Sequence, residues 1–167
     1  MESAPAASGS SGGGGSSGAL AGIGFGLQIG TPTALTFKFG APGNADIVLG
    51  IGAGIAFRGD PFGLSLHGDY LLTLAPLLHN GTINLDFYMG PGLWIVLFNA
   101  GSFAFFNGYI VATNFNLFGI GARLPIGLNL RFTTAPVEFY LELDPALFAF
   151  PAVGFFVGSA LGFRWFF

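Results

Sequence analysis

Ser65, His67 and Asp69 stand at alternate positions and supply the hydroxyl, imidazole and carboxylate of a catalytic triad. Alternate residues of a β-strand lie about 7 Å apart, which is too far for direct contact between a nucleophile and its base. The pattern therefore favours a hydrogen-bond network over hydrolysis or acyl transfer. We expect that the protein is not an enzyme.

Other residue patterns that could bind a cofactor or a metal ion are weak. The Gly-x-Gly-x-Gly runs at residues 22–26 and 50–54 match phosphate-binding loops in spacing only, because no Lys or predicted helix follows them. His67 and His79 show no metal-ligand spacing, and the absence of cysteine excludes thiolate ligands. We expect neither a cofactor nor a metal site.

Charged side chains are few, and they are the best candidates for a functional site. The chain has 5 Lys and Arg and 8 Asp and Glu, so it lacks the basic surface that binds nucleic acid. The candidate ionic cluster consists of Lys38, Arg58, Asp69, Asp86, Arg123, Arg131, Glu138, Glu142, Asp144 and Arg164. Polar and aromatic residues on the same predicted faces are Gln28, His67, Tyr88, Trp94 and Tyr140. Since buried charges need partners, we expect these groups to pair and fill an interior, and a narrow ion path is the alternative.

The elements that position these residues are strands with two different faces. In residues 153–167 large apolar side chains alternate with small ones, a period of two that predicts a β-strand. The chain is 52% hydrophobic and only 8% charged, which is too little charge to cover the surface of a soluble protein. Long uncharged stretches could also form membrane helices, but their alternation disfavours that alternative.

Eight segments show the same alternation and predict eight strands. They cover about residues 19–30, 34–40, 46–58, 64–74, 82–98, 116–132, 137–144 and 153–167. Pro125 cannot donate a ladder hydrogen bond, so we expect a bulge or a break there. A tight hairpin at residues 133–136 would place Arg131 opposite Glu138, as a charge pair that fixes the register. The connections at residues 75–81, 99–115 and 146–152 are predicted loops.

The positions of the charges test this assignment. All 5 basic residues, and every acidic residue of the predicted strands, fall on the faces opposite the large apolar side chains. A Lys or Arg facing lipid would cost roughly 2–4 kcal/mol near the midplane. Lipid also requires that every backbone polar group is paired, which for a sheet means closure. The sequence thus predicts an all-β fold, an eight-stranded antiparallel transmembrane β-barrel with an up-and-down meander.

The predicted barrel domain covers residues 19–167. An eight-stranded barrel has an interior just wide enough for side chains to fill, so we expect inward Gly and Ala to lie against large residues. Residues 1–18 are rich in Ser, Gly and Ala, which predicts a disordered tail or linker. They lack the basic start and apolar core of a signal peptide, and we expect a form from which that peptide has been removed or replaced.

The last predicted strand ends with apolar residues at alternate positions, Phe163, Trp165 and Phe167. With the alternation over residues 19–167, this pattern resembles the small eight-stranded bacterial outer-membrane barrels of the OmpA transmembrane domain and OmpX type. The resemblance implies the outer membrane of a Gram-negative bacterium, the lipid bilayer as a partner, and a C-terminal signal that the barrel-insertion machinery reads. The apolar segments Phe103 to Phe106 and Phe148 to Phe150 depart from the polar loops of that class. They could lie in the membrane interface, gather a hydrophobic ligand at the barrel mouth, or meet a partner, which includes self-association.

These observations lead us to expect a structural, membrane-anchoring barrel with a side-chain-filled lumen. A narrow pore or conduit for small solutes or hydrophobic molecules is the alternative. A lipid-modifying barrel enzyme is a less favoured hypothesis, because the Ser, His and Asp of the eight-stranded acyltransferase barrel cannot be mapped onto this sequence.

Overall fold

Nearly all of the described residues lie in β-strands, in which successive side chains alternate between two faces. The computed structural model describes residues 22–54, 63–98, 103–106, 109–112, 117–150 and 153–167. The predicted tail at residues 1–18 lies outside them. The strands are β1 (Ile23–Gly30), β2 (Thr33–Ala41), β3 (Ala45–Gly54), β4 (Gly63–His79), β5 (Ile83–Met89), β6 (Gly92–Phe98), β7 (Phe103–Phe106), β8 (Tyr109–Ala112), β9 (Leu117–Arg123), β10 (Ile126–Phe132), β11 (Val137–Phe150) and β12 (Gly154–Phe166). The part of the chain described here contains no helix of the length and apolar character needed to cross a membrane.

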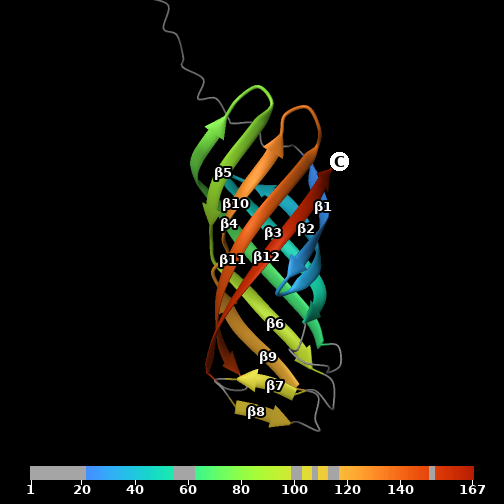
Figure 1. Cartoon of the computed structure of the whole chain (residues 1–167), viewed down its shortest axis with the longest axis vertical. Helices are drawn as coiled ribbons and strands as arrows, with labels where there is room; N and C mark the ends of the chain where they lie inside the picture. Colours follow the sequence, from blue (N-terminus) through green and yellow to red (C-terminus); the bar gives the residue numbers. More distant parts are fainter. Residues whose placement is uncertain (1–21, 55–62, 99–102, 107–108, 113–116, 151–152) are drawn as a thin grey trace, which may run out of the picture.

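Ten of these strands form one antiparallel sheet that closes on itself. Its order is β10-β5-β4-β3-β2-β1-β12-β11-β9-β6, and the further pairings β10–β11 and β4–β6 complete the ring. The first strand pairs with the last, with Gly24 opposite Phe166 and Gly30 opposite Ala160. The described strands therefore form an all-β antiparallel meander with the architecture of a β-barrel (Figure 1). The hairpin of β7 and β8 is a separate sheet at the end of the barrel opposite the C-terminus (Figure 1).

Prolines divide two of the predicted strands, so the main sheet has ten strands instead of the eight expected. The break predicted at Pro125 is confirmed, because β9 ends at Arg123 and β10 begins at Ile126. A second break at Pro91, between β5 and β6, was not predicted. The pairing continues across both breaks, since the carbonyl of Pro91 accepts from Tyr70 N at 2.9 Å and that of Pro125 accepts from Gly90 N at 3.2 Å.

Each of the three predicted loops contains strand. Strand β4 continues to His79 instead of ending near residue 74, and bulges between Thr73 and Ala75 and between Pro76 and Leu78 explain why the alternation is lost there. Strand β11 continues to Phe150, with a register shift between Phe148 and Phe150. The predicted apolar loop at residues 99–115 contains the β7–β8 hairpin, whose side chains lie outside the described residues, so self-association through it stays a prediction.

The interior is filled by large side chains that lie on glycines of the neighbouring strand. A Cβ atom added to Gly162 would overlap the ring of Tyr140, which is its cross-strand partner. Gly50 stands in the same relation to the buried ring of His67. Gly127 is covered by Tyr88 in the same way. Small-against-large packing is therefore confirmed at these pairs, and the barrel wall needs glycine where the interior carries a ring.

We predict that Gly162→Ala destabilises the barrel by roughly 1–3 kcal/mol, because the added methyl group overpacks a filled interior. The free energy of unfolding in urea, measured on detergent-folded protein, checks this. Gly81→Ala is the matched control, since a Cβ there would meet nothing within 4 Å. Equal stability of the two variants would contradict the packing argument.

Candidate functional site

Glu138 is the centre of the buried ionic network. It lies on β11, is fully buried (0% exposed), and accepts contacts from three other strands. Its Oε2 lies 2.8 Å from Nζ of Lys38 on β2 and 3.0 Å from Nδ2 of Asn129 on β10. Its Oε1 accepts from Nη1 of Arg164 on β12 at 2.7 Å. One carboxylate thus ties strands on different sides of the ring to each other.

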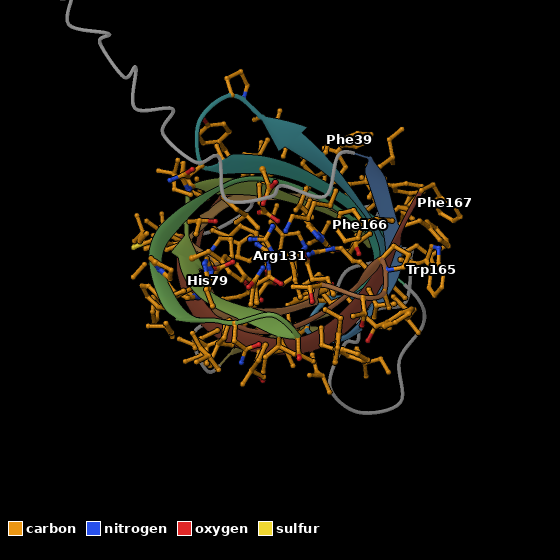
Figure 2. All side chains as sticks on the ribbon, turned by 90° about the horizontal axis from the view of Figure 1, so that it is seen from above. Phe39, His79, Arg131, Trp165, Phe166 and Phe167 are labelled. Atoms are coloured by element: carbon orange, nitrogen blue, oxygen red, sulfur yellow. The ribbon has the colours of Figure 1, made fainter. Side chains whose placement is uncertain are left out.

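The network extends to the end of the barrel at which the chain terminates. Lys38 makes a second ion pair with Asp46, at 3.0 Å. At the same end, Asp86 pairs with Arg131 at 2.5 Å and its other oxygen lies 2.6 Å from Nε2 of His79. Viewed from this end, Arg131 points into the ring (Figure 2). Asp46, His79, Asp86 and Arg131 also line a cavity of about 220 Å³ at this mouth.

The predicted pair of Arg131 and Glu138 is correct in register and wrong in contact. The two residues are cross-strand partners in the β10–β11 ladder. However, Arg131 pairs with Asp86 of β5, and Glu138 pairs with Lys38 and Arg164. Several charged side chains lie within reach of each residue. Arg131 reaches diagonally to Asp86 on the adjacent strand β5. Glu138 pairs with Arg164 on the adjacent strand β12 and with Lys38 on β2, which does not neighbour β11. Backbone register alone does not choose among them.

A second group of charges surrounds Arg123, and we name it the Arg123 cluster. It contains Arg123 with the carboxylates of Asp69, Glu142 and Asp144. The guanidinium lies 3.1 Å from Asp69, 2.7 Å from Asp144 and 3.6 Å from Glu142. Glu142 also accepts a hydrogen bond from the hydroxyl of Tyr88 at 2.7 Å. These four charged side chains are at most 2% exposed.

Tyr140 and Gln28 connect the network to the barrel wall. The guanidinium of Arg164 lies 3.8 Å from the centroid of the Tyr140 ring, a cation–π contact. The Tyr140 hydroxyl donates to Oε1 of Gln28 at 3.2 Å, and Nε2 of Gln28 donates to the carbonyl of Pro32 at 3.1 Å. These polar groups satisfy one another inside the ring.

Beyond the Arg123 cluster, toward β7 and β8, the interior becomes aromatic. The ring of Trp94 lies 5.3 Å from that of Phe148 and 5.8 Å from that of Phe156, and we name these three residues the aromatic layer. Nε1 of Trp94 donates to Oγ of Ser65 at 2.7 Å. The predicted apolar loop at Phe148 is therefore wrong, since this residue is a buried part of β11.

The geometry gives no catalytic relay among Ser65, His67 and Asp69. Oγ of Ser65 accepts a hydrogen bond from Trp94, and neither ring nitrogen of His67 has a hydrogen-bond partner. Nε2 of His67 lies 3.9 Å from Asp69. Within the described ranges, no three His, Cys, Asp or Glu side chains are grouped so that they could hold a metal ion. The arrangement can pair charges and exclude water.

The structure places the predicted site residues in two locations. The charged, polar and aromatic residues predicted for the interior lie there, with the exception of Arg58, which is outside the described residues. Phe163, Trp165 and Phe167 point away from the ring and are exposed, and Figure 2 shows Trp165 and Phe167 on the outside. The predicted cluster omitted Asn129 and Thr36, although alternation places both on inner faces. Their polar contacts to Glu138 and Arg164 depend on partners that a sequence pattern does not identify.

We predict that Glu138→Gln destabilises the barrel by about 3–5 kcal/mol, because it leaves two buried cations without their shared partner. Urea unfolding of the detergent-folded protein measures the loss. The control is Asp46→Asn, which should cost about 1 kcal/mol or less because Asp46 is half-buried and Lys38 keeps its ion pair with Glu138. A larger loss for Asp46→Asn would contradict the assignment of Glu138 as the centre.

Comparison with solved structures finds the crystal structure of Ail, the attachment invasion locus protein of Yersinia pestis. The match covers 87% of this chain and 95% of that chain, at 14% sequence identity and a TM-score of 0.34. This similarity is too low to support an inference about activity. No curated protein matches the chain. Residues 16–166 match the model of a protein family described as a protein of unknown function, DUF3996. The chain therefore belongs to the DUF3996 family.

Proposed function

We propose that the chain is a β-barrel of the outer membrane of a Gram-negative bacterium, with eight membrane-crossing segments. Strands β5 and β6 form one segment because both pair with β4, and β9 and β10 form another because both pair with β11. The proposed role is structural and membrane-anchoring, with a lumen filled by side chains.

The observation that carries this proposal is the inverted distribution of polarity. In the described strands no Asp, Glu, Lys or Arg is exposed. Large apolar side chains are exposed instead, for example Leu143 at 57% and Leu161 at 58%. A soluble protein places its charges outside and rarely exposes a continuous apolar surface. Lipid is the solvent that this outer surface matches.

The proposal includes two partners of the outer surface. The bilayer would surround the apolar side chains, and Trp165 would lie at an interface, where aromatic residues are enriched. The outward row of Phe163, Trp165 and Phe167 would act as the insertion signal that the barrel-insertion machinery reads. Their exposure on the outer face supports this role, because a signal must be accessible.

A closed lumen is favoured over a pore by two successive barriers. The ionic network pairs cations from β2, β9, β10 and β12 with carboxylates of other strands. The aromatic layer of Trp94, Phe148 and Phe156 then fills the interior toward the other end. A solute would have to displace both. We propose no enzymatic role, and support for this comes from the absence of a Ser65–His67 hydrogen bond.

We predict that Leu143→Lys lowers the free energy of unfolding from lipid vesicles by roughly 2–4 kcal/mol, because Leu143 lies near the middle of β11 and would place a charge in hydrocarbon. Thr134→Lys, in the exposed turn between β10 and β11, is the control and should leave stability nearly unchanged. If Leu143→Lys is as stable as the control, the outer face is not in lipid.

A further inference from the structure

The charges of the interior do not balance evenly along the barrel. Around Glu138, the two cations Lys38 and Arg164 face the two carboxylates Glu138 and Asp46. At the mouth, Arg131 faces Asp86. Among their Lys, Arg, Asp and Glu side chains, these two groups hold equal numbers of positive and negative charges.

The Arg123 cluster is different, because one guanidinium faces three carboxylates. Asp69, Glu142 and Asp144 all approach Arg123, and no other Lys or Arg of the described residues forms an ion pair with them. Fully ionised, the cluster would carry an excess of two negative charges on side chains that are at most 2% exposed.

An excess of this kind is not stable in a closed interior. An unpaired carboxylate in a medium of low polarity takes up a proton instead of remaining charged. Carboxylates that share one site cannot all be ionised, for the same reason. A bound metal ion could also supply the missing charge, but no group of three ligands is placed to hold one in the described residues.

Unpartnered polar atoms mark where the protons would be held. Both ring nitrogens of His67 lack hydrogen bonds, although its side chain is 0% exposed, and Nε2 faces Asp69 at 3.9 Å. Oδ2 of Asp144 also lacks a partner, while Oδ1 binds Arg123. Asp144 could therefore carry a proton on Oδ2 without losing its contact to Arg123.

The geometry points to a buried proton-binding site in the Arg123 cluster, which holds two protons in the folded barrel at neutral pH. One proton belongs to the His67–Asp69 pair and one to Asp144, whose Oδ2 has no hydrogen-bond partner. The titratable and charged groups that face the site are His67 and Asp69 from β4, Tyr88 from β5, Arg123 from β9, Glu142 and Asp144 from β11, and Arg164 from β12. The site depends on the closed lumen of the proposed function and not on the membrane in which the barrel lies.

Infrared spectroscopy of the detergent-folded wild type at neutral pH tests the site directly. We expect the C=O stretching band of a protonated carboxylic acid, with a shift in ²H₂O. Asp144→Asn should weaken this band, and Asp69→Asn serves as a second variant if the first does not fold. Asp46→Asn, which removes a carboxylate that is paired with Lys38, should leave the band unchanged. A wild-type spectrum without the band would overturn the proposal.

The pH dependence of folding gives an independent readout. The folded state would bind more protons than the unfolded state, so stability must fall as pH rises, by about a factor of ten in the folding equilibrium constant per pH unit for each extra proton. The folding equilibrium constant of the wild type should therefore fall about a hundredfold per pH unit near neutrality, and that of Asp144→Asn about tenfold. A stability that is independent of pH, or that follows the concentration of Na⁺ or K⁺ at fixed ionic strength, would overturn proton binding. Because these measurements use detergent-folded protein, failure of the lipid-facing test with Leu143→Lys would not affect them.

Discussion

The structure depends on the need to pair the charge of Glu138, which is 0% exposed inside the ring. A buried carboxylate is tolerated only when cations and hydrogen-bond donors surround it. Lys38, Asn129 and Arg164 provide these contacts from β2, β10 and β12. Asn129 and Arg164 come from the two strands that flank β11, and Lys38 comes from β2, which two further strands separate from it. Through Lys38, the pairing of this carboxylate is linked to the curvature that brings β2 toward β11.

The interior has two halves that serve different purposes. The half near the C-terminus is ionic, and one of its ion pairs, between Lys38 and Glu138, joins strands that are not neighbours in the sheet. The half toward β7 and β8 contains the aromatic layer, in which the indole N–H of Trp94 donates a hydrogen bond to Ser65. Both halves fit only because glycines face the large side chains, as Gly162 faces Tyr140. Side-chain packing fills the interior, and ion pairing determines which strands its charged side chains connect.

Alternation in the sequence predicted the strands and the inner position of the charges, because a period of two has a direct structural meaning. The missing N–H of Pro125 predicted the break there, and the tight hairpin at residues 133–136 predicted the register that opposes Arg131 and Glu138. Alternation did not predict the extension of β4 to His79, since bulges disturb the alternation there. The ion-pair partners were not predictable either, because they join residues as far apart in the sequence as Lys38 and Glu138. Such contacts depend on how the ring closes.

We propose that the interior of this barrel is sealed by its paired charges and by the aromatic layer. The most direct test is single-channel current across a planar bilayer, with protein shown to be folded by its heat-dependent mobility in gels. If the interior is sealed, folded protein should produce no current steps. Reproducible steps of uniform size from folded protein would contradict this proposal, because they would require an open path through both barriers.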